Sequence, residues 1–213
     1  MALFEELVQI PADSVNLEGI MVLPEQTRGL VLFAHGSGSS RLSPRNNFVA
    51  QQLQQEKIGT LLMDLLTERE DTAYATRFDI DLLTERLLQA TQWLQDQPRT
   101  QPIAIGYFGA STGAAAALKA ATTVGLTIRA IVSRGGRPDL AEEALASVQS
   151  PTLLIVGGND EIVLQLNRDA YAQLRSEKKL TIVPGASHLF EEPGTLEKVA
   201  QLAIQWFKQH FAA

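Results

Sequence analysis

Short apolar runs alternate along the chain with longer segments in which apolar positions recur every three or four residues. Six of the runs are almost continuously apolar and end in Gly or Asp, a pattern typical of parallel strands buried on both faces. These predicted strands are 29–36, 59–64, 103–109, 128–136, 151–158 and 180–185. Two more polar runs, 3–10 and 15–24, precede any helical segment and are predicted to form an antiparallel pair at one edge of the sheet.

Three segments have the periodicity of amphipathic helices. The segment 43–57 opens with Ser43 as a helix cap and Pro44 at the first helical position. The segments 79–98 and 192–211 each place apolar side chains on one face. These side chains are Leu83, Leu87, Ala90 and Leu94 in the first of the two, and Leu196, Val199, Ala203 and Trp206 in the second.

The alternation of strands and helices predicts the α/β class: a mostly parallel central sheet with helices on both faces and an antiparallel N-terminal edge. No internal repeat or linker interrupts the pattern, so we expect a single domain over residues 1–213. The segment between Gly136 and Pro151 is too short for a large lid domain, which favours an open site and small substrates.

Composition excludes several kinds of partner. The 213 residues carry a formal charge of −6 without a Lys/Arg-rich run, so nucleic acid is not expected as a partner. The chain has no cysteine, which excludes disulfides, thiolate metal sites and a cysteine nucleophile. It shows no signal-peptide pattern and no apolar run of membrane-spanning length. We therefore expect a soluble, cytoplasmic protein without a membrane partner; the oligomeric state is not readable.

The most informative motif is Gly109-Ala110-Ser111-Thr112-Gly113, a G-x-S-x-G match. It lies between a predicted strand and the helix-forming run "AAAALKAA", which is the strand-to-helix corner that a nucleophile elbow requires. The glycines allow helix and strand to approach closely around a strained serine. The pattern therefore predicts Ser111 as a nucleophile, and the alternative is a simple turn with a helix cap.

A serine nucleophile needs a base and a group that orients the base. Of the three histidines, His188 follows the last predicted strand and is the predicted base; His35 is expected to be structural and His210 solvated. Asp160, after the penultimate strand, is the predicted acid, because elbow hydrolases order their triads as serine, acid and histidine. Asp64 and Asp139 are its rivals, and capping of the next helix is its alternative role.

Two further groups of residues are predicted to act on the substrate. The backbone N–H groups of Thr112 and Ser37 are the candidate oxyanion hole, since one follows the nucleophile and the other lies in the Gly-rich loop after an early strand. Arg41 and Arg134, on the side where parallel strands present ligands, are candidates for binding an anionic substrate. Solvated surface arginines are the alternative.

Four segments together, "VLFAHGSGSS", "GYFGASTG", "PTLLIVGGND" and "VPGASHLFEEPG", resemble the dienelactone hydrolase branch of the α/β-hydrolase superfamily. The resemblance covers most of the chain and implies a hydrolase that uses Ser111, Asp160 and His188 without a cofactor or metal. Dienelactone hydrolase itself is known for a cysteine nucleophile, whereas this chain has a serine there. The fold assignment is unaffected, but dienelactone as the substrate does not follow.

These observations predict a serine hydrolase that cleaves a small carboxylic ester, lactone or thioester through an acyl-serine intermediate. An acyltransferase that uses the same intermediate, and a binding protein of the same fold without catalysis, remain alternatives. A nucleotide-binding protein fits poorly, because Arg41 replaces the third glycine of G-x-G-x-x-G and no G-x-x-x-x-G-K-[ST] is present.

Overall fold

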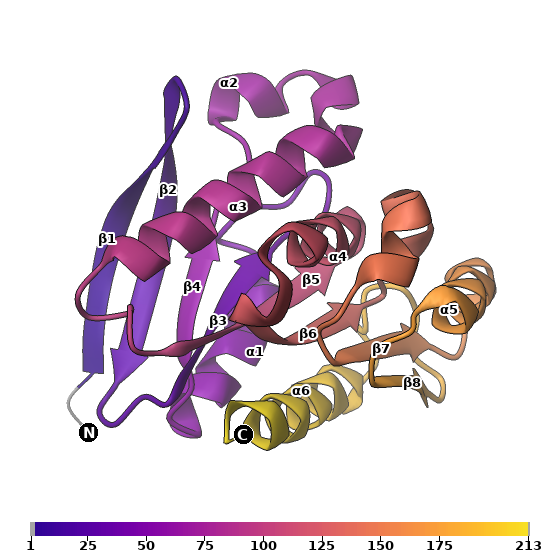
Figure 1. The fold of residues 1–213 in the computed structure, drawn as a ribbon. Helices are drawn as coiled ribbons and strands as arrows, with labels where there is room; N and C mark the ends of the chain where they lie inside the picture. The colour runs from indigo at the N-terminus through magenta and orange to yellow at the C-terminus, as the bar shows by residue number, and fades with distance from the viewer. Residues whose placement is uncertain (1–2, 213) are drawn as a thin grey trace.

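The computed structural model describes residues 3–212 and is built around an eight-stranded sheet in the order β1-β2-β4-β3-β5-β6-β7-β8 (Figure 1). The strands are β1 (Leu3–Ala12), β2 (Val15–Pro24), β3 (Gly29–Ala34), β4 (Gly59–Met63), β5 (Ala104–Ala110), β6 (Ile128–Arg134), β7 (Thr152–Gly157) and β8 (Lys178–Val183). The pairs β1–β2 and β2–β4 are antiparallel, and all pairs from β4 to β8 are parallel. The predicted fold class is confirmed.

Helices cover both faces of the sheet (Figure 1). They are α1 (Pro44–Gln55), α2 (Glu68–Asp71), α3 (Ile80–Asp96), α4 (Thr112–Val124), α5 (Glu161–Gln173) and α6 (Thr195–Phe211), with 3₁₀ helices η1 (Tyr74–Phe78), η2 (Gly125–Thr127) and η3 (Pro138–Ser147). Helices α3 and α4 pack on one face, and α1 and α6 pack together on the other. None of the helices within residues 3–212 is both long and apolar enough to cross a bilayer.

Each face of the sheet has its own apolar core because side chains alternate between the faces along every strand. On β3, Leu32 packs towards α3 and α4, whereas Val31 and Phe33 pack towards α1 and α6. The predicted apolar faces are buried, except that Leu196 is only partly buried. Removing this apolar surface from water is the main favourable term in folding.

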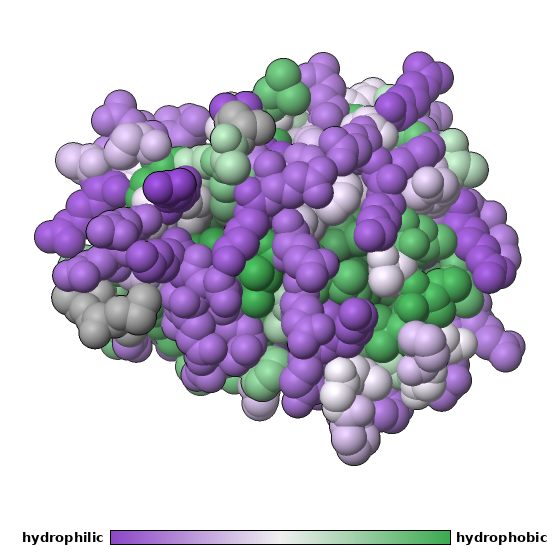
Figure 2. Space-filling view, turned by 90° about the horizontal axis from the view of Figure 1, so that it is seen from below, coloured by the Kyte–Doolittle hydropathy of each residue, from purple (hydrophilic) through white to green (hydrophobic). Residues whose placement is uncertain are grey.

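The parallel strands all present their carboxyl ends at the same edge of the sheet, where ligands bind in open α/β folds. The loops after β3, β5, β6, β7 and β8 meet there and carry the predicted site residues. Strand β1 begins and helix α6 ends at the bottom of Figure 1, on the opposite side. The view from below shows mainly polar side chains on that side, with apolar surface visible between them (Figure 2).

Candidate active site

Ser111 lies at the corner between β5 and α4 and has an unusual backbone conformation. Its φ is 51° and its ψ is −121°, outside the regions that non-glycine residues normally adopt. Such a conformation costs of order 1–3 kcal/mol and is found mainly at functional sites. Helix α4 begins at the next residue, Thr112, so the positive end of the helix dipole lies beside the serine. This is the geometry that the sequence predicts for a nucleophile elbow.

The two glycines of the motif allow α4 to lie against the sheet. A Cβ on Gly113 would lie 2.5 Å from the carbonyl oxygen of His35 and closer still to that of Ala34. A Cβ on Gly109 would lie 2.8 Å from the backbone nitrogen of Ala114. Real Cβ atoms essentially never make contacts this short, so both positions require glycine for space.

His188 and Asp160 are joined by a hydrogen bond of 2.6 Å between Nδ1 and Oδ2. Asp160 occupies the N-cap position of α5, yet its side chain makes no capping bond there. Its carboxylate is largely buried, whereas the histidine side chain is 38% exposed. The carboxylate therefore fixes the ring orientation of His188 and leaves Nε2, the other ring nitrogen, as the candidate base.

The loops that carry this pair are tied to each other. The backbone N–H of Asn159 donates to the carbonyl of Ala186, and the Asn159 side chain donates to Gly185. The Ser187 N–H donates to the Glu192 carboxylate, which lowers the pKa of Glu192. Sequence reasoning missed Asn159 and Glu192 as loop-holding residues; the only signal was that they lie beside the predicted triad members.

Ser111 and His188 line a common cavity of about 260 Å³ at the carboxyl edge of the sheet, near the lower end of ligand pocket sizes. Ser37, from the loop after β3, and Arg134, from the end of β6, line it as well. The structure thus brings together five sequence-predicted residues around one space: Ser111, His188, Ser37, Arg134 and, through its bond to His188, Asp160.

The candidate oxyanion donors are both close to Ser111, and Ser37 lines the same cavity. Thr112 follows the serine in α4, and a Cβ on Gly36, next to Ser37, would touch the Ser111 Cβ at 3.0 Å. Within residues 3–212, the backbone N–H groups of Ser37 and Thr112 donate no hydrogen bond to the rest of the backbone. Both groups fit the requirement for donors that are not already used.

Asp64 and Asp139, the two alternative candidates for the acid of the triad, each form an ion pair with an arginine. Asp64 pairs with Arg41, which also pairs with Glu18, and Asp139 pairs with Arg137 through two hydrogen bonds. Arg41 is therefore held by two carboxylates, and unlike Arg134 it is not part of the cavity that holds Ser111. From the sequence we could place these arginines in loops at the carboxyl edge of the sheet, but we could not predict the carboxylates with which they form ion pairs.

The other two histidines have structural contacts. The backbone N–H of Leu65 donates to Nε2 of His35 at 2.9 Å, and Nδ1 of His35 lies 2.9 Å from the Gly36 carbonyl. Burial lowers the pKa of His35, which keeps the ring neutral in this arrangement. The expectation that His210 is solvated was wrong: it is only 9% exposed because it packs edge-on against Trp206, with ring centroids 4.6 Å apart.

Comparison with known proteins identifies the family. The profile of the dienelactone hydrolase family matches residues 49–211. The chain belongs to this family. A crystal structure of a dienelactone hydrolase from Anabaena variabilis ATCC 29413 is 54% identical, with 98% of each chain covered and a TM-score of 0.95. Est1E from Butyrivibrio proteoclasticus, at 16% identity, a TM-score of 0.83 and coverage of 97% of this chain and 99% of its own, shows the same fold. Family and fold together show that the chain has the α/β-hydrolase fold.

One curated relative of this dienelactone hydrolase family member has a different name. A protein of Mycobacterium tuberculosis strain H37Rv, provisionally named a phosphoribosyl transferase, is 56% identical over 206 residues. The match covers 97% of this chain but 46% of that protein, so the chain spans about half the length of the relative. The name describes the longer protein.

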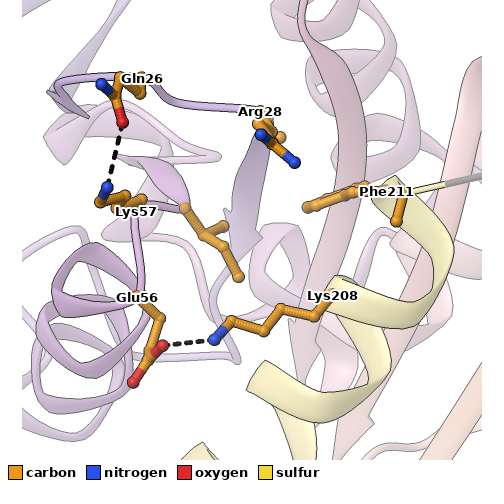
Figure 3. A pocket seen from close by; sticks show the side chains of 9 residues that line it. Gln26, Arg28, Glu56, Lys57, Lys208 and Phe211 are labelled. Atoms are coloured by element: carbon orange, nitrogen blue, oxygen red, sulfur yellow. Dashed lines mark hydrogen bonds and ion pairs between the residues drawn. The ribbon is translucent and has the colours of Figure 1, made fainter.

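A second cavity of about 290 Å³ lies at the opposite edge of the sheet, between the start of β3, the end of α1 and the end of α6 (Figure 3). Its lining includes Arg28 and Phe211, the hydrogen-bonded pair Lys57 and Gln26, and the ion pair Lys208 and Glu56. Although this cavity is slightly larger, none of the predicted catalytic residues line it. Among the described residues, no three His, Asp or Glu side chains come close enough together to hold a metal ion.

Proposed function

We propose that this dienelactone hydrolase family member is a serine hydrolase that cleaves a small carboxylic ester, lactone or thioester through an acyl-Ser111 intermediate. The observation that carries the proposal is the 2.6 Å hydrogen bond between His188 and Asp160 at the cavity that also holds the strained Ser111. A histidine oriented by a largely buried carboxylate at the same cavity as a partly exposed serine is the arrangement that activates a serine for acyl transfer.

In the proposed first step, Oγ of Ser111 attacks the carbonyl carbon of the substrate and His188 Nε2 accepts the hydroxyl proton. Asp160 keeps the ring in place and stabilises the imidazolium that forms. The N–H groups of Thr112 and Ser37 donate hydrogen bonds to the oxyanion. Collapse of the tetrahedral intermediate breaks the bond to the leaving group, and His188 returns the proton to the departing oxygen or sulfur.

In the proposed second step, a water molecule attacks the acyl carbonyl while His188 accepts one of its protons. Collapse then breaks the bond between the acyl group and Oγ, and the proton returns to Ser111. The acid is released and the enzyme is restored. An acceptor alcohol in place of water would give an acyltransferase, with the same residues in the same roles.

The experiment compares the hydrolysis of short 4-nitrophenyl esters by the parent, by Ser111→Ala and by the control Ser147→Ala, which changes an exposed serine in η3. Loss of the nucleophile should lower kcat by about 10⁴-fold or more, whereas the control should match the parent. Product analysis with added alcohols separates hydrolysis from acyl transfer. Ester hydrolysis by Ser111→Ala at the parent rate would show that Ser111 is not the nucleophile, and no hydrolysis by the parent would favour the non-catalytic binding protein.

A further inference from the structure

The two edge strands of the sheet differ in how well they are protected against pairing with another chain. Strand β8 has six residues and begins with Lys178 and Lys179, and both a short length and lysines discourage pairing at an edge. Strand β1 has ten residues, contains no lysine and pairs with β2 in one continuous register without a bulge. Within residues 3–212 no strand lies on its other side, at the left of the sheet in Figure 1. Strand β1 is therefore an unprotected edge.

The outer side of β1 presents the backbone hydrogen-bonding groups of alternate residues. The hairpin between β1 and β2 has a two-residue loop, so the residues that flank the loop exchange both of their backbone hydrogen bonds. The even-numbered residues of β1 therefore bond to β2, and the N–H and C=O groups of Glu5, Leu7 and Gln9 point outwards. Pro11 also falls on the outward side, where its missing N–H breaks no bond to β2.

The side chains of these outward-bonding residues are exposed. Side chains alternate between the two faces of a strand, so Val8 lies in the core whereas Glu5, Leu7 and Gln9 do not. Leu7, in the middle of the strand, is 77% exposed. Ile20 lies directly opposite Leu7 in β2 and is only partly buried, so the two side chains form an apolar pair open to solvent.

We infer that β1 is a self-association site, at which a second copy of this chain pairs antiparallel through its own β1 about a two-fold axis at Leu7. In this register Leu7 lies opposite Leu7 of the second copy, and each Glu5 lies opposite a Gln9. Each of these residue pairs exchanges two backbone hydrogen bonds, about six in all. The Gln9 amide donates to the facing Glu5 carboxylate, and the apolar pairs of Leu7 and Ile20 from both copies cover one another.

The neighbouring registers are less favourable. An axis at Glu5 or at Glu6 would place carboxylates of the two copies directly opposite each other. An axis at Val8 would place each Glu5 opposite a Pro11, and the missing N–H would remove two of the hydrogen bonds. In the favoured register the two Glu6 side chains are only diagonal neighbours, about 7–8 Å apart, and Arg99 lines the same groove as Glu6 and offsets their repulsion.

The first test measures the oligomeric state by sedimentation velocity at protein concentrations up to about 100 μM. The parent should form a dimer in a concentration-dependent way. Leu7→Lys should raise the Kd of the dimer by about tenfold or more, because it removes apolar contact and places like charges opposite each other at the axis. Ile182→Lys is the matched control, since Ile182 is 40% exposed on β8, the other edge strand, and it should leave the Kd unchanged.

The second test checks the register with single cysteines, since the chain has none of its own. Facing residues in a hydrogen-bonded antiparallel pair have Cα atoms about 5.5 Å apart, within the range that a disulfide spans. Leu7→Cys should therefore form a disulfide-linked dimer under mild oxidation, and so should an equal mixture of Glu5→Cys and Gln9→Cys. Glu5→Cys alone should not, because its two copies lie about 13 Å apart along the paired strands.

Two results would overturn the inference. A parent that stays monomeric over the whole concentration range would leave the edge of β1 free for a strand of a different protein and would exclude a second copy as the occupant. A dimer that is unaffected by Leu7→Lys and forms none of the expected disulfides would show that the copies associate through a different surface. Neither test depends on ester hydrolysis, so both outcomes leave the proposed function intact.

Discussion

Replacing Gly113 by alanine tests whether the close packing of α4 against β3 is required. Gly113 lies in the first turn of α4, where alanine is favoured over glycine by about 1 kcal/mol on helix propensity alone. The added Cβ, however, would lie 2.5 Å from the His35 carbonyl oxygen and closer to that of Ala34. Ordinary contacts at such positions begin at 3.4 Å, so the end of β3 and the start of α4 must separate by most of an ångström or more.

Overpacking of this kind costs about 1–3 kcal/mol or more, which exceeds the gain in helix propensity. We expect a net loss of about 2 kcal/mol in the free energy of unfolding and a Tm lower by about 4–8 °C. The shift also separates Ser111 from the loop of Ser37, and a displacement of about 1 Å can cost about 100-fold in rate. The expected result is therefore a lower Tm together with a lower kcat.

Thermal unfolding followed by circular dichroism and ester hydrolysis on the same preparation measure both effects. Gly194→Ala is the control: its φ of 82° strains an alanine, but no atom lies within 4 Å of the added Cβ. That variant should lose about 1–2 kcal/mol in stability and keep its kcat. A Gly113→Ala protein with a raised Tm and unchanged kcat, as helix propensity alone predicts, would refute the packing argument.

Three further predictions follow from side-chain contacts. Asp160→Asn should lower kcat by about 10³–10⁴-fold in steady-state ester hydrolysis, because His188 loses the carboxylate that orients and stabilises it; a loss of less than tenfold would contradict this role. Burial lowers the pKa of His35, so below about pH 6.5 the unfolded chain binds a proton at this residue more readily than the folded protein does. As the pH falls through this range, the free energy of unfolding should therefore decrease by up to about 1.4 kcal/mol per pH unit because of His35. Denaturant titrations at pH 7.5 and 5.5 should show a smaller pH effect for His35→Asn, and an unchanged one would contradict the assignment. Tyr107→Phe removes a buried 2.6 Å hydrogen bond to Thr91, whose hydroxyl still bonds the carbonyl of Leu87, so calorimetry should show a loss of only about 1 kcal/mol in the free energy of unfolding; a loss above 3 kcal/mol would contradict it.

Much of the fold could be predicted from the sequence because local patterns determine it. All eight predicted strands are present, and their ends coincide with the predicted ones or differ from them by one or two residues. The strand order was not predictable, because the placement of β4 between β2 and β3 depends on how the crossover through α1 packs. The short elements α2 and η1 were missed because four or five mostly polar residues show no helical periodicity.

In the candidate site, too, the residues that could be predicted are those whose geometry depends on the local sequence. Ser111 was identifiable because its conformation depends on neighbours two residues away in the chain. Residues whose environment depends on distant segments were not: Arg41 pairs with Glu18 and Asp64, each 23 residues away, and His210 is buried by packing against Trp206. The uncompensated burial of Arg134 could not be predicted either, since a sequence does not show which charges lack a partner. That the chain lacks a large lid domain stays a prediction.

Covalent labelling of the folded protein tests directly whether Ser111 is an activated nucleophile. The folded protein is treated with a fluorophosphonate, which reacts with activated serines, and the adduct is located by peptide mass spectrometry. We expect a single adduct on the peptide that contains Ser111, slower labelling in His188→Asn, and none in Ser111→Ala. An adduct on a different residue, or equal labelling of the Ser111→Ala protein, would show that Ser111 is not the nucleophile.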